Sequence, residues 1–194
     1  VFTFLACCGF VKPTMKVCAR RFNIYFAALA ALVLICGCQT EKNQKPNPKK
    51  TVAALRVHLE SSPSESGTTQ TVSVLRANPV AVTIARDPIL TEANVIAAKV
   101  IEAPGGFGIE IRFDETGSMI LEQYSAANPG RHFVIFAQWG EKLTDGRWLA
   151  APLITHRIAD GVLAFTPDCS REEADQLVLG LNNVAKKIQK GYFK

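Results

Sequence analysis

Cysteine is scarce in the part of this chain that would fold into a domain. The sequence has 194 residues and six cysteines, but only Cys169 follows Cys38, and the rest lie at positions 7, 8, 18 and 36. A single cysteine forms neither a disulfide framework nor a cysteine-based metal site. Cys169 is then either a nucleophile or a neutral residue that fills space ahead of a helix, and we favour the second.

The main body also lacks a surplus of positive charge. The whole chain has a formal net charge of +5, from 22 Lys and Arg against 17 Asp and Glu. Residues 51–194 hold 14 of these basic residues and 16 of the acidic ones, so the excess lies near the N-terminus. Nucleic-acid binding depends largely on neutralising phosphates. We therefore expect no nucleic-acid partner.

The apolar run near the N-terminus is too short to cross a bilayer. Residues 22–35 are almost wholly apolar, whereas a spanning helix needs about 20 such residues. A basic stretch that begins at Met15 precedes the run, as in a signal peptide. We expect a signal peptide over residues 1–37, with the true start at Met15. A short uncleaved anchor is the alternative.

The end of this run resembles the signal of bacterial lipoproteins. Ile35, Cys36 and Gly37 come directly before Cys38, and in that signal the cysteine is acylated and becomes the first residue of the mature protein. We expect lipidation at Cys38, a flexible lysine-rich tether over residues 38–50, and one domain over residues 51–194. The expected location is the bacterial cell envelope, facing the periplasm or the exterior, with the membrane as a partner through the lipid.

Beyond the tether, the apolar pattern predicts an α+β fold. Apolar residues alternate with polar ones in segments typical of strands, at residues 55–60, 71–74, 80–84, 98–102, 108–113, 132–138, 147–154 and 162–165. A helical spacing covers residues 116–128 and 170–189, and a shorter helix is expected from Thr91 to Ala98. We expect a mainly antiparallel sheet with two or three amphipathic helices packed on it. The glycines at 105, 106 and 108 predict a hairpin turn.

Several short motifs follow one another in a specific order along the chain. They are LTEANVIAAKV (residues 90–100), FGIEIRFDETG (107–117), NPGR (128–131), APLI (151–154), IADG (158–161), FT (165–166) and EEA (172–174). In this order they resemble the head subdomain of the first periplasmic domain of SecD and SecDF, accessory subunits of the preprotein translocase. The resemblance implies this α+β fold and contact with translocating polypeptides or translocase components.

Two departures from the family limit what the resemblance implies. SecD-like proteins carry several transmembrane helices and intramembrane charges for proton-driven work, and nothing in this sequence matches them. We therefore expect no proton-coupled export by this chain alone. The family's short hairpin after residue 136 is also replaced by a longer loop over residues 138–148.

Few residues suggest catalysis or cofactor binding. A hydrolase needs a nucleophile, a base and an orienting group held together, and His156, Asp160 and Cys169 are the one arrangement to consider. His58 and His132 have no metal-ligand partner at a recognisable spacing. We expect no enzyme activity, no catalytic residues, no metal and no cofactor.

The candidate binding residues lie around the longer loop. Trp139 and Trp148, the only tryptophans, flank it together with Arg147. An exposed pair would hold apolar stretches of another chain, whereas a buried pair would only pack across the hairpin. Our leading hypothesis is a lipid-anchored envelope protein that binds polypeptide or an envelope component in connection with protein export, and an open edge strand would favour it. The alternatives are a structural envelope lipoprotein without a client, and a hydrolase.

Overall fold

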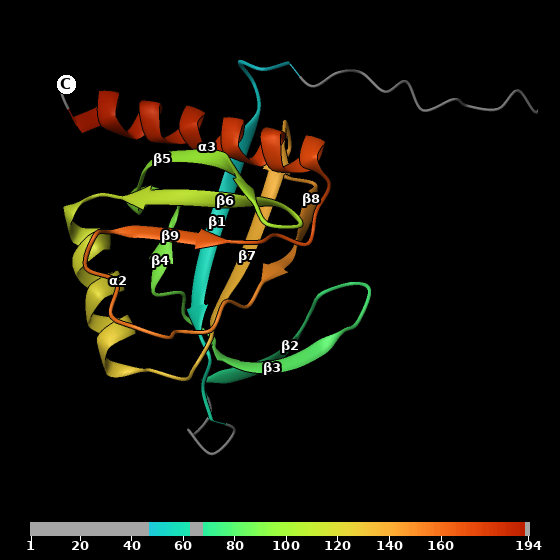
Figure 1. Ribbon diagram of the computed structural model, residues 1–194. Helices are drawn as coiled ribbons and strands as arrows, with labels where there is room; N and C mark the ends of the chain where they lie inside the picture. Colours follow the sequence, from blue (N-terminus) through green and yellow to red (C-terminus); the bar gives the residue numbers. More distant parts are fainter. Residues whose placement is uncertain (1–46, 63–67, 193–194) are drawn as a thin grey trace, which may run out of the picture. The chain divides into compact units, whose positions relative to one another are not determined.

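The computed structural model describes residues 47–62 and 68–192 (Figure 1). The expected signal peptide, Cys38 and most of the tether lie outside these residues. The last tether residues form a turn on the domain: the N–H of Asn47 donates to Glu141 over 3.2 Å, and Asn183 Nδ2 donates to the carbonyl of Pro48 over 2.8 Å. The folded part thus begins slightly before the expected boundary at Thr51.

Four antiparallel strands form the largest sheet, in the order β4-β1-β7-β8. They are β1 (Val52–Leu59), β4 (Leu90–Thr91), β7 (Phe133–Gly140) and β8 (Asp145–Ala150). β1 and β7 pair along their whole length, from Val52 opposite Gly140 to Leu59 opposite Phe133. Alternate residues of both strands therefore point into one shared core.

A second sheet of three antiparallel strands, β5-β6-β9, runs across this first sheet (Figure 1). It contains β5 (Val95–Ala103), β6 (Gly106–Phe113) and β9 (Val162–Phe165). The predicted hairpin is confirmed: Ala103 pairs with Gly106, and Gly105 has φ +82°, which suits the third position of a turn after Pro104. Buried residues from both sheets make up one main core, including Leu55, Ile111 and Leu163.

In the described part of the chain, two α-helices complete the domain, α2 (Glu115–Ala127) and α3 (Arg171–Tyr192). Ser170 caps α3, because Ser170 Oγ accepts from the N–H of Glu173, whose carboxylate accepts from the N–H of Ser170. The predicted apolar stripe faces the main core, with Leu177 and Leu181 each 1% exposed. Within the described residues, no helix is both long and apolar enough to span a membrane.

The helix expected from Thr91 to Ala98 is wrong. A single 3-10 turn, η1 (Glu92–Asn94), is followed at once by β5. Val95 already has extended backbone angles, φ −83° and ψ 126°, and its side chain is buried, whereas Ile96 is 39% exposed. This part of β5 is therefore a strand, which suits β-branched residues. Its alternation is interrupted where the pairing with β6 shifts between Val95 and Ala97, so that Ile96 and Ala97 are both exposed.

The strands β2 (Thr69–Val74) and β3 (Val80–Ala85) form a separate hairpin. It covers the outer face of the first sheet, where Val74, Val82 and Ile84 pack with Val134 in a second, smaller core. The α+β class with antiparallel strands is confirmed, although the strands of the described residues form three sheets rather than one.

Candidate functional site

The hairpin of β7 and β8, the predicted binding element, turns its two tryptophans to opposite faces of the sheet. Trp139 is 1% exposed and lies in the main core. The Trp148 ring lies on the other face, 5.4 Å from the ring of His58 and 5.0 Å from that of Phe136. The exposed tryptophan pair is therefore not formed, and the packing alternative describes both residues. The expected long loop is mostly strand, because Trp139 pairs with Asp145.

Arg147 lies on the core side of this hairpin. Its guanidinium carbon is 5.0 Å from the centre of the Trp139 ring, and its Nη2 donates to Glu173 Oε1 over 2.6 Å. Because Glu173 belongs to the first turn of α3, Arg147 connects β8 to that helix and covers Trp139. The direct role of Arg147 or Trp148 in binding stays a prediction.

The three residues considered for hydrolysis do not form a catalytic arrangement. His156 contacts Thr155 Oγ1 at 2.9 Å, and Asp160 accepts the N–H of Val162 over 3.1 Å. Burial and the nearby Glu173 carboxylate raise the pKa of Cys169 to about 11, so its thiol stays protonated near neutral pH. His156 and Asp160 line one cavity, which Cys169 does not reach. No group of three candidate metal ligands occurs in the described part of the chain.

Two adjoining cavities lie along β9, and we call them together the β9 groove. One, of about 550 Å³, lies between the β2–β3 hairpin, residues 150–152 and residues 165–166. The other, of about 510 Å³, lies between residues 162–164 and residues 152–160. Pro152 lines both. Each volume is in the usual range of ligand pockets, about 300–1,000 Å³.

The walls of the β9 groove are mainly apolar. Leu75, Val80 and Leu153 are 44%, 51% and 51% exposed, so large apolar side chains meet solvent here. Leu75 adopts a left-handed backbone with φ 69°, which is uncommon for leucine. Exposed apolar surface that gathers around a concave site is typical of an interaction site.

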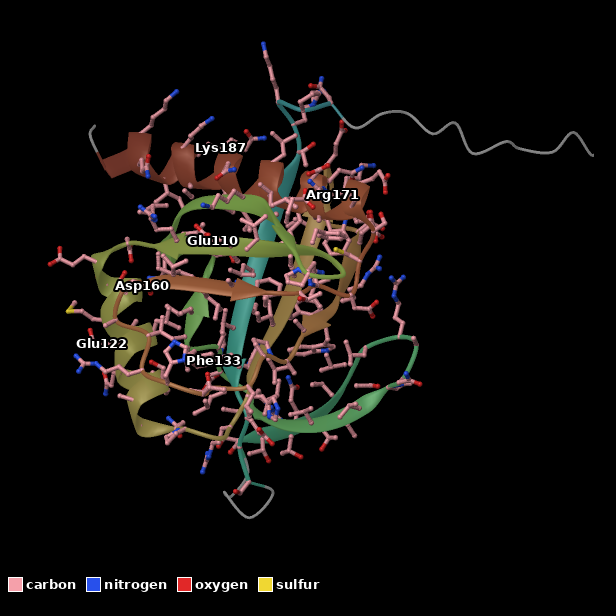
Figure 2. All side chains as sticks on the ribbon, viewed as in Figure 1. Glu110, Glu122, Phe133, Asp160, Arg171 and Lys187 are labelled. Carbon is pink, nitrogen blue, oxygen red and sulfur yellow. The ribbon has the colours of Figure 1, made fainter. Side chains whose placement is uncertain are left out.

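Polar groups also line the groove. At the first cavity, Glu60 Oε2 accepts from the backbone N–H of His132 over 2.9 Å and lies 2.6 Å from its Nδ1. Asp160 lines the second cavity, and Figure 2 shows it where the chain enters β9, with Phe133 lower down at the start of β7. The groove thus combines apolar walls with a few charged groups.

The comparison with known families assigns residues 68–185 to a family. They match the sequence model of the family described as "SecDF, P1 head subdomain", which is well over half of the chain. The chain belongs to this family. The matched range begins just before β2, so β1, a central strand of the largest sheet, precedes it.

Solved SecDF structures are similar to this head-domain protein at low sequence identity. One, described as a membrane component that enhances protein export, is 20% identical, with a TM-score of 0.48 over 69% of this chain and 64% of that chain. Another, a translocon-associated membrane protein from Thermus thermophilus, is 14% identical, with a TM-score of 0.40 over 86% of this chain and 34% of that one. The chain thus spans about a third to two thirds of these proteins. No curated protein matches it.

The β9 groove was missed in the sequence. Residues 151–154 were predicted to continue a strand from residue 147, but β8 ends at Ala150. The segment that follows makes isolated main-chain contacts instead of a regular strand pairing, such as the single bridge between His132 and Leu153. One signal for it was available: Pro152 lacks an N–H and so disfavours regular pairing in a central strand.

Proposed function

We propose that this chain is a lipid-anchored protein of the cell envelope whose SecDF head domain binds extended polypeptide, or another envelope component, in connection with protein export. The observation that carries this proposal is the apolar β9 groove on a domain of the SecDF head family. Unfolded polypeptides expose apolar side chains, and such side chains gain most by entering apolar cavities.

The anchor is the second part of the proposal. It rests on the lipoprotein-like sequence that ends at Cys38 and on the lysine-rich segment behind it. At about 3.3 Å per extended residue, the eight residues between Cys38 and Asn47 would let the domain lie up to about 26 Å from a membrane surface. A groove held at that distance would meet polypeptides as they emerge from the membrane.

Site-specific crosslinking in cells tests the binding function. A photo-reactive residue at Leu153, in the groove, is compared with one at Lys187, which is exposed on α3 (Figure 2). We expect adducts with exported polypeptides, or with a single envelope partner, at position 153 and few at 187. Absence of adducts at 153 would instead favour the structural lipoprotein without a client.

A further inference from the structure

The hydrogen-bond pattern of β9 leaves main-chain groups without partners. The N–H of Phe113, the last residue of β6, donates to the carbonyl of Gly161, the residue just before β9, over 3.0 Å. Gly161 therefore bonds to β6. In an antiparallel pair, only alternate residues bond to a given neighbour. Leu163 and Phe165 therefore bond to β6, while Val162 and Ala164 direct their N–H and carbonyl groups away from it.

Within the described residues, these outward groups are mostly unpaired. Asp160 accepts the N–H of Val162, which leaves the carbonyl of Val162 and both main-chain groups of Ala164. They lie at the edge of the sheet, since among the described strands β9 pairs only with β6, and residues 162–164 line the second cavity of the β9 groove. Ala164 itself is exposed.

The opposite edge of the same sheet is protected at Ala98. There, the side-chain amide of Asn182 on α3 accepts from the N–H of Ala98 and donates to its carbonyl, each over 2.9 Å. This amide occupies the position that a neighbouring strand would take. Soluble proteins commonly protect exposed strand edges in such ways, so the open edge at Ala164 contrasts with the protected one at Ala98.

We infer that an extended polypeptide binds in the β9 groove by adding a strand to β9. Its backbone pairs with Ala164 and with the carbonyl of Val162, and its side chains alternate between the two sides of the strand. The first cavity, beside the exposed Leu75 and Val80, takes an apolar side chain. Main-chain hydrogen bonds give affinity that does not depend on the side chains of the bound peptide. The site therefore suits many polypeptides with alternating apolar residues.

This inference rests on the proposed function, and the test separates the two. The full chain in mild detergent is titrated with a short labelled peptide of alternating Leu and Ser, and with the same peptide N-methylated along both edges. We expect N-methylation to weaken binding about tenfold or more, the effect of losing a few net hydrogen bonds. If both peptides bind equally, strand addition is wrong while polypeptide binding stands. If neither binds, the polypeptide-binding part of the proposed function fails.

A pair of variants tests the same edge from the protein side. Ala164→Pro removes the outward N–H at an edge position, where proline is tolerated, and Ala164→Ser keeps it. We expect only the proline variant to lose peptide binding, and we expect the peptide to slow amide hydrogen exchange at Ala164 in the unmodified protein. Unchanged exchange with peptide bound would overturn the inference even if Ala164→Pro fails to fold. The inference would also be overturned if the protein formed a dimer without peptide and Ala164→Pro dissociated that dimer. A second copy of the chain would then occupy the edge.

Discussion

Gly180 of α3 lies directly against Ala53 of β1. A Cβ atom on Gly180 would be 2.8 Å from the Cβ of Ala53 and 2.7 Å from the carbonyl carbon of Val52. Both distances are well below ordinary van der Waals contact, so the helix reaches this close to the sheet only because residue 180 has no side chain.

We predict that Gly180→Ala destabilises the domain, against the usual preference for alanine in helices. Helix propensity alone would favour alanine by about 1 kcal/mol, but the clash with the β1 backbone forces a shift that typically costs about 1–3 kcal/mol. Gly191, in the last turn of α3, is the matched control, because a Cβ there meets nothing within 4 Å. Denaturant unfolding should show a loss for Gly180→Ala and none for Gly191→Ala. Equal effects would mean that α3 does not pack as described.

A second prediction concerns the apolar stripe of α3. Leu181 is 1% exposed, whereas Leu179, two positions earlier, is 37% exposed. Leu181→Ala should lower the free energy of unfolding by about 2–5 kcal/mol, and Leu179→Ala by about half a kcal/mol or less. A change below about half a kcal/mol at Leu181 would place this face of the helix in solvent.

The sequence predicted α3 well because its stripe is regular and long, and because Ser170 and Glu173 mark its start. It failed at Val95 and Ile96, where a short apolar pair fits a helix and a strand equally well. The face of the sheet on which each tryptophan lies depends on the register between β7 and β8. Trp148 lies opposite Phe136, on the other face from Trp139. That register follows from the length of the turn, which apolar periodicity does not determine.

The β9 groove was not predicted from the sequence, for a different reason. Its walls come from the β2–β3 hairpin, residues 150–160 and β9, which are brought together only by the packing of the two sheets. Periodicity indicates which residues are buried, but not which exposed ones become neighbours. The family resemblance gave the fold without giving this surface.

The third prediction separates packing from binding at the two tryptophans. Trp139→Ala should cost about 3–5 kcal/mol, because it empties part of the main core. Trp148→Ala, at a half-buried position, should cost about 1–2 kcal/mol. If polypeptide binds in the β9 groove rather than at this hairpin, neither variant should weaken peptide binding under conditions in which it is folded, as checked by a melting curve on each sample. Lost binding by a fully folded Trp148→Ala would restore the hairpin as a binding site.

The fourth prediction is a pH dependence at His58. This ring is buried beneath Trp148, with Nδ1 2.9 Å from the carbonyl of Ala85, and burial lowers its pKa below the usual value. The unfolded chain takes up a proton near pH 6.5, whereas the folded protein resists it until a lower pH. The stabilising contribution is therefore complete above about pH 6.5 and decreases as the pH falls toward the folded pKa.

Denaturant unfolding between pH 7.5 and pH 5 measures this effect. We expect stability to fall with pH, and His58→Gln to reduce that slope, since glutamine also offers an N–H to Ala85 but does not titrate. His156→Gln is the control, because His156 is exposed. An unchanged slope in His58→Gln would show that this ring titrates alike in both states.

The last prediction concerns the anchor at Cys38. If Cys38 is acylated, Cys38→Ala blocks lipid attachment, and the cleavage that follows acylation also fails. The variant should therefore accumulate as a larger precursor that lacks the acyl label. Metabolic labelling with a radioactive fatty acid, followed by electrophoresis of membrane fractions, shows both changes at once. Cys36→Ala is a demanding control, since it alters a neighbouring cysteine within the signal but leaves the acceptor in place. Normal processing and membrane association of Cys38→Ala would exclude the lipid anchor, and the domain would then reach its location by another route.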